Sequence, residues 1–152
     1  MATAALTMCL YTDASVGKKL AAIVVVQRVG IETRVLRQEV IGWAKTCSVL
    51  AAELATIAIA LHHADRHFHH TQIVLLSDSQ RALRAIQVGH VSGSKRTLLY
   101  RILQGVASLT KKKTDVRLRW VSAHEEIAGN EEADEAARAA SSRKGKPSAP
   151  AL

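Results

Sequence analysis

The chain has 152 residues, of which 48% are hydrophobic, and a formal net charge of +8. This length favours a single domain with a sizeable core, and the apolar content excludes extensive disorder outside the ends. Its two cysteines are too few for a disulfide framework or a zinc knuckle, and no signal peptide or apolar run of the ~18 residues that span a membrane is visible. The sequence therefore predicts an intracellular protein without a membrane segment, and its charge favours a polyanionic partner.

The first predicted strand leads to a carboxylate. Residues 6–15 form a β-prone run with apolar side chains on both faces, which is typical of a strand covered on both sides. We place Asp13 where this strand leaves the sheet, at the edge where open α/β sheets bind ligands. Strands predicted at 20–27 and 32–41 follow through tight turns, which indicates an antiparallel meander with a polar edge strand.

A long helix is predicted next, at 48–68, with Thr46 or Ser48 as its N-cap. Its apolar residues define one buried stripe, formed by Leu50, Leu54, Ile57, Leu61, Ala64 and Phe68. Glu53 lies beside that stripe, where a carboxylate is costly unless a cation meets it. His63 and His67 lie one turn apart, which is workable zinc geometry, but a solvated histidine-rich helix end is the favoured interpretation.

A second apolar run, at 72–78, again ends in an aspartate, Asp78. A strand that follows the meander through a long helix indicates a right-handed crossover, and hence a strand parallel to the first. If the two strands are neighbours, Asp13 and Asp78 emerge side by side. Each carboxylate alone is more typical of a turn or a helix cap.

The rest of the chain is predicted to alternate between helix and strand. A loop at 89–93 precedes a helix that Ser94 caps and Lys111–Lys113 closes, and residues 116–120 alternate as a half-exposed strand. A loop at 121–129 carries His124, and a final helix from Asn130 carries Asp134 in its first turns. We expect a domain at 1–141 and a basic, flexible tail at 142–152.

Four short motifs together resemble one known family. They are Tyr-Thr-Asp-Ala-Ser at 11–15, Ala-Ala-Glu-Leu at 51–54, Ser-Asp-Ser-Gln at 77–80, and the segment 124–134. Each motif alone is weak, but their order and spacing fit the elements described above. The chain resembles the ribonuclease H family, and most closely the ribonuclease H domains of eukaryotic LINE-type (non-LTR) retrotransposon polyproteins.

The resemblance implies a fold, a reaction and a catalytic site. The fold is α/β and ribonuclease H-like, with a five-stranded mixed sheet in the order 3-2-1-4-5 and helices on both faces. The reaction is metal-dependent cleavage of the RNA strand of RNA–DNA hybrids, leaving 5′-phosphate and 3′-hydroxyl ends. Asp13, Glu53, Asp78 and Asp134 would bind two Mg²⁺ ions, with Mn²⁺ as the alternative, and His124 would assist proton transfer or product release. Clustered carboxylates do require cations, and hard oxygen donors favour these two metals.

Candidate substrate contacts follow from the same resemblance. Cellular members of the family contact RNA 2′-hydroxyls through paired asparagines shortly before the helical glutamate, and apolar residues stand at 49–50 here. Ser48 and Gln80 remain as side-chain candidates, and Ala14 and Ser15 as neighbours of the first aspartate. Discrimination of RNA from DNA would then depend on the backbone and on groove shape.

The expected partners are an RNA–DNA hybrid and, where the domain belongs to a polyprotein, the rest of that reverse transcriptase. We expect a monomer. Two alternatives stay open at this point. One is a nuclease of the same superfold that acts on other nucleic acids, and the other is a catalytically idle module that only binds nucleic acid or a protein.

Overall fold

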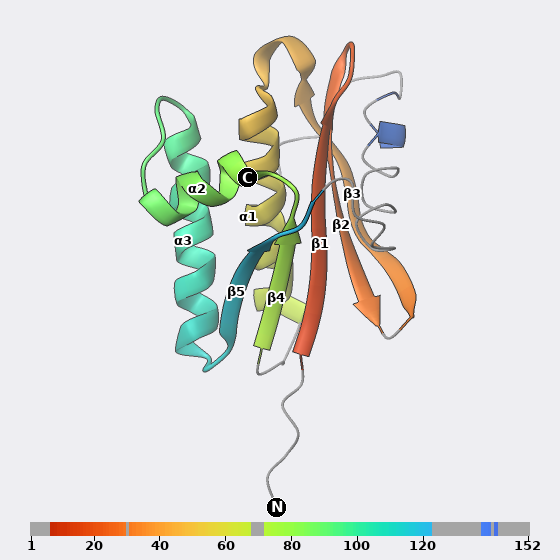
Figure 1. Cartoon of the computed structure of the whole chain (residues 1–152). Helices are drawn as coiled ribbons and strands as arrows, with labels where there is room; N and C mark the ends of the chain where they lie inside the picture. Colours follow the sequence, from red (N-terminus) through yellow and green to blue (C-terminus); the bar gives the residue numbers. More distant parts are fainter. Residues whose placement is uncertain (1–6, 30, 68–71, 123–137, 141, 143–152) are drawn as a thin grey trace, which may run out of the picture.

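A five-stranded mixed sheet forms the centre of the molecule (Figure 1). The computed structural model describes residues 7–29, 31–67, 72–122, 138–140 and 142. In chain order the elements are β1 (Thr7–Val16), β2 (Leu20–Val29), β3 (Glu32–Trp43), the short 3₁₀ helix η1 (Ala44–Thr46), α1 (Val49–His67), β4 (Gln72–Ser77), α2 (Gln80–Val88), α3 (Lys95–Lys111) and β5 (Asp115–Trp120). The strand order is β3-β2-β1-β4-β5, which confirms the predicted topology.

The central strand, β1, has a different kind of neighbour on each side. It pairs antiparallel with β2 and parallel with β4, and the parallel pairing ends at Thr12 opposite Ser77. Asp13 is paired only with Val24 of β2. The prediction that Asp13 marks the strand end is therefore wrong. The strand continues to Val16, because its pairing with β2 extends beyond the end of β4.

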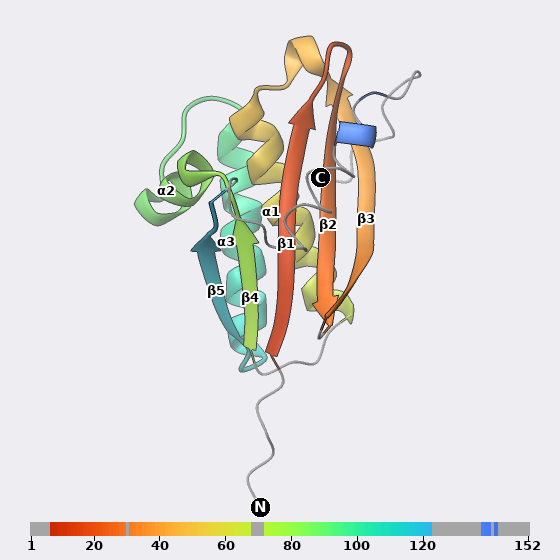
Figure 2. The same ribbon diagram turned by 45° about the vertical axis from the view of Figure 1, so that its right-hand side comes forward.

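The main core lies between one face of the sheet and the helices α1 and α3 (Figure 2). The prediction of one buried stripe on α1 is too narrow, because every residue from Ala52 to Leu61 is buried. The sheet covers one side of this helix and α3 packs on another. On α3, Leu99 and Ile102 are buried, whereas the neighbouring Leu103 is 46% exposed.

A smaller apolar cluster covers the opposite face of the sheet. It consists of Tyr11, Val24 and Val26, with Leu76 packed against it. Residues 138–140 are helical, and Figures 1 and 2 show this blue segment on the side of the sheet away from α1. Ala140 within it is fully buried. Helices therefore lie on both faces of the sheet, as predicted.

Serine side chains cap α1 and α2. Ser48 Oγ accepts a hydrogen bond from the Ala51 amide at 3.1 Å, so Ser48 rather than Thr46 caps α1. Ser79 caps α2. Ser94 makes no side-chain cap, contrary to prediction, because its own backbone is already helical.

Several predicted features lie outside the described residues. They are Phe68, most of the loop carrying His124, the start of the final helix with Asp134, and the tail beyond Ser142. None of the described helices combines the length and the apolar character needed to cross a membrane.

Candidate active site

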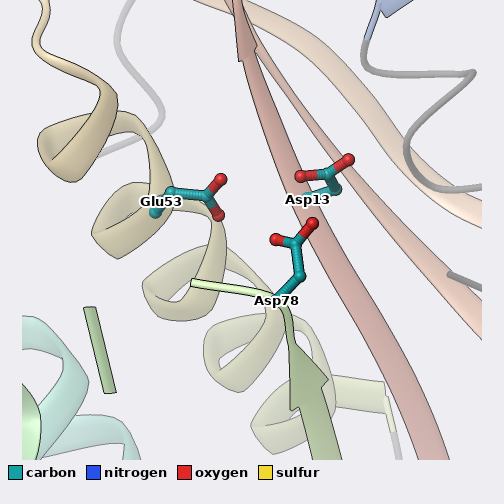
Figure 3. A group of neighbouring side chains, drawn as sticks. All are labelled: Asp13, Glu53 and Asp78. Carbon is teal, nitrogen blue, oxygen red and sulfur yellow. The ribbon is translucent and has the colours of Figure 1, made fainter. Parts of the chain in front are cut away.

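Three carboxylates from distant parts of the chain converge beside the centre of the sheet. Asp13 comes from β1, Glu53 from α1 and Asp78 from the residue after β4, and Figure 3 shows the three side chains pointing toward one another. One oxygen of each lies within 4.8 Å of the others. Asp13 and Glu53 are only 3% and 5% exposed, and Asp78 is half-buried.

The end of β4 positions Asp13. This aspartate is the first residue of β1 beyond the parallel pairing, so the neighbouring strand no longer covers it on that side. Thr12 Oγ1 donates a hydrogen bond to the Leu76 carbonyl at 3.3 Å, which ties the two strands together just before the site. The Ala14 amide donates to Asp13 Oδ1 at 2.9 Å and fixes the carboxylate.

A buried threonine holds the helix that carries Glu53 against β1. Thr56 lies three residues after Glu53 and is fully buried. Its hydroxyl donates to the Ala52 carbonyl at 2.8 Å and lies 3.4 Å from the Asp13 carbonyl oxygen. The second contact is long for a hydroxyl hydrogen bond, so close packing of α1 on β1 is the larger part of this attachment.

Local hydrogen bonds fix the turn that carries Asp78. The Ser79 amide donates to Ser77 Oγ at 3.1 Å, and Ser79 Oγ accepts from the Ala82 amide at 3.2 Å as the N-cap of α2. Asp78 therefore lies between a strand end and a helix start, both of which are held by serine hydroxyls. The sequence predicted this strand–aspartate–helix arrangement.

The electrostatics of the cluster favour a hard cation. Asp13 Oδ2 and Glu53 Oε2 are buried, and burying carboxylate oxygens together costs free energy through desolvation and mutual repulsion. An all-oxygen donor set suits Mg²⁺ or Mn²⁺ better than zinc. The three side chains therefore fit a divalent metal. Among the described residues, no histidine joins such a group, although the rings of His63 and His67 have centroids 4.5 Å apart.

The other predicted site residues differ in their exposure, and two of them lie outside the described residues. Ala14 and Ser15 follow Asp13 on β1 and are half-buried, with Ala14 packed against the main core. Gln80 is exposed as the first residue of α2, and Ser48 is exposed at the start of α1. His124 and Asp134 lie outside the described residues, so the structure brings together three of the four predicted carboxylates.

A basic groove near the cluster was not predicted from the sequence. It has a cavity volume of about 610 Å³ and runs between the start of α1, the helix α2 and the loop before α3. Ser48 lines it together with the basic side chains Arg81, Arg84, His90 and Lys95. The available signal was the spacing of Arg81 and Arg84, which places two cations on neighbouring positions of one helix face.

The order of the strands defines a ribonuclease H-like fold, and the acidic side chains gather where β1 extends beyond the end of β4. A family model described as RNase H matches residues 5–142. The chain belongs to the RNase H family.

Two solved structures share this fold. RNase H1 from the halophilic archaeon Halobacterium salinarum is 23% identical, with a TM-score of 0.63 over 88% of this chain and 96% of that chain. The N-terminal RNase H domain of a Mycobacterium tuberculosis protein, solved as a fusion with maltose-binding protein, is 19% identical, with a TM-score of 0.67 over 89% of this chain and 98% of that chain. No curated protein matches the chain.

Proposed function

We propose that the chain is a metal-dependent endoribonuclease that cleaves the RNA strand of RNA–DNA hybrids and leaves 5′-phosphate and 3′-hydroxyl ends. The observation that carries this proposal is the convergence of Asp13, Glu53 and Asp78 within 4.8 Å, in a member of the RNase H family. Binding alone gives no reason to bury acids together, so the cluster favours catalysis over an idle module.

The acidic residues would hold the metal. Asp13, Glu53 and Asp78 supply oxygen donors from three elements, and Asp134 is proposed as the fourth. Two bound Mg²⁺ ions, or Mn²⁺ in their place, would activate a water molecule and stabilise the departing oxygen of the phosphodiester. The buried positions of Asp13 and Glu53 exclude bulk water from one side of the site.

The remaining residues are assigned to the substrate. His124 would assist proton transfer or product release, a role for which an imidazole side chain is suitable. Ser48 lines the basic groove, and Gln80 stands at the N-terminal end of α2 next to it, so both could contact the hybrid. Ala14 and Ser15 are proposed to approach it near the metals. Arg81, Arg84 and Lys95 would pair with phosphates, which set affinity and register without reading sequence.

The biological setting is also a proposal. In the structure α2 is joined to α3 by residues 89–94 alone, so no additional basic helix stands between them. The motifs at 11–15, 51–54, 77–80 and 124–134, which resemble those of retrotransposon polyproteins, support a domain that acts within a larger polypeptide. We propose that the isolated chain is an intracellular monomer whose partner, besides the hybrid, is the remainder of such a reverse transcriptase.

Cleavage of labelled substrates tests the proposal. The chain should cut the RNA strand of a hybrid in Mg²⁺, should not cut it in EDTA, and should leave double-stranded RNA and DNA intact. Asp78→Asn should abolish cleavage while hybrid binding persists, because the phosphate contacts lie elsewhere. Asp115→Asn is the matched control, since Asp115 lies at the opposite end of the sheet on β5 and should leave cleavage unchanged.

The outcomes separate the alternatives. Cleavage by Asp78→Asn within about tenfold of the wild-type rate would exclude the proposed metal site, since a lost ligand should cost far more. Preferred cutting of another nucleic acid would identify a different nuclease. Hybrid binding without cleavage in either metal would identify an idle module.

A further inference from the structure

A second groove lies on the side of α1 away from the carboxylates. Its cavity volume is about 610 Å³, and it is bounded by α1, α3 and Arg37 of β3. His62, which lines it, follows Glu53 by nine positions, about two and a half helical turns, so the two residues point to opposite sides of α1. A ligand in this groove would therefore not compete with the proposed catalytic site.

The groove combines an apolar floor with a polar rim. Ala58, Ile59 and Gly105 form the floor, and the first two are 4% and 3% exposed. On the rim, Tyr100 is 61% exposed, and its hydroxyl accepts a hydrogen bond from Gln104 at 3.1 Å. Exposed Tyr and Arg beside a cavity are typical of protein-binding sites, whereas nucleic-acid grooves depend on repeated phosphate contacts.

The charge around the groove is positive. Asp65, the acidic residue that lines the groove, forms an ion pair with Lys112 at 2.7 Å and accepts hydrogen bonds from the Ser108 hydroxyl. On β3, Arg37 binds Glu39, but Arg101 on α3 has no acidic partner among the described residues. Burial lowers the pKa of the neighbouring His63, and the charges of His67, Arg37 and Arg34 lower it further. The neutral form of His63 is thus favoured, first by burial and then by neighbouring positive charges, among them Arg37 of the groove.

We propose that this groove is a docking site for an acidic peptide segment of a partner protein, which inserts one apolar side chain over Ile59 and pairs a carboxylate with Arg101. Charge complementarity selects the acidic partner, and the cavity selects the apolar anchor. The apolar floor favours a peptide over a nucleic-acid strand, and so does Asp65, whose negative charge lines the groove. This site is independent of hybrid cleavage.

Selection from a phage-displayed library of short random peptides tests the proposal on the full chain. We expect enrichment of peptides that combine acidic residues with an apolar one. Their affinity, measured with fluorescent synthetic copies, should fall at least about tenfold in Arg101→Glu, because a favourable charge pair becomes a repulsive one. Arg84→Glu is the matched control, since it makes the same charge change in the basic groove near the carboxylates and should leave peptide affinity unchanged. Arg101 is exposed, and a thermal melt confirms that Arg101→Glu is folded.

Three further measurements decide the outcome. Peptide binding should raise the His63 pKa in NMR titrations, because an anion lowers the local positive potential. The proposal would be overturned if the selection enriched neutral or basic peptides or no peptides at all. It would also be overturned if Arg101→Glu left the affinity of the enriched peptides unchanged. Tighter, Arg101-dependent binding of a fluorescent single-stranded RNA would show a nucleic-acid site instead. Hybrid cleavage should be unchanged in Arg101→Glu, so failure of the proposed function would appear separately in the wild type.

Discussion

Asp78→Asn should not destabilise the metal-free protein. The substitution keeps the shape of the side chain and removes one of three charges whose oxygens lie within 4.8 Å of one another. At that separation and an effective dielectric constant of about 20, each repulsive pair costs about 3 kcal/mol before proton uptake or counterions relieve it. Asp78 takes part in two such pairs. Because proton uptake and counterions relieve most of this repulsion in the metal-free protein, we expect Asp78→Asn to raise the free energy of unfolding by about 1 kcal/mol. This corresponds to a rise of about 2–4 °C in Tm.

Thermal melts in EDTA and in millimolar Mg²⁺ provide the assay. Mg²⁺ should raise the wild-type Tm by mass action, by about 2.7 kcal/mol of stability at a hundredfold excess over Kd, and should raise the variant's Tm less. Asp115→Asn, far from the cluster, should respond to Mg²⁺ as the wild type does. A structural aspartate predicts a different pattern, namely a loss of about 0.5–2 kcal/mol that Mg²⁺ does not change. That pattern would refute the metal assignment.

Three further predictions concern other residues. Hydrogen bonds from Lys112 and Ser108 outweigh the effect of burial and hold the pKa of Asp65 below its usual range. Lys112→Met should therefore cost at most about 1 kcal/mol at neutral pH in urea unfolding. This difference should shrink as the pH falls below about 4, through the depressed folded-state pKa, and what remains reflects the hydrogen bond of Lys112 to the Asp65 carbonyl. Ser79→Ala removes the cap of α2 and should cost about 0.5–2 kcal/mol by the same measurement; an unchanged midpoint would mean that the cap contributes nothing. His124→Ala should slow hybrid turnover about a hundredfold or less without loss of Mg²⁺ binding, and damage as severe as that of Asp78→Asn would make it a ligand.

Three carboxylates were predictable because each has a local sequence signal, whereas the strand order followed from the resemblance to the ribonuclease H family. Asp13 and Asp78 each follow an apolar run, just where the pairing of β1 with β4 ends, and Glu53 is unusual as a carboxylate beside the apolar positions of α1. Element boundaries were less accurate, as with β1, which continues past Asp13. That extension depends on pairing with β2. The composition of β1 alone does not indicate how many of its residues β2 pairs with.

Surface grooves could not be predicted in the same way. The groove near the carboxylates joins Ser48 to Lys95, and the second groove joins Arg37 to Arg101, so both arise from helix packing between distant segments. Exposed arginines look alike in sequence whether they line a cavity or point into solvent. Leu103 shows the same limit, because an apolar residue of a helix carries no local signal of exposure and this one is 46% exposed.

The parallel pairing of β1 with β4 also has a consequence for biosynthesis. These strands join residues 65 positions apart, such as Thr7 and Gln72. A nascent chain that stops before residue 72 already contains Asp13 and Glu53, but it lacks the strand that completes the middle of the sheet, and an unpaired edge of β1 remains. The proposed nuclease would therefore be inert until translation has passed this point. Premature termination would release an aggregation-prone fragment and not a partly active enzyme.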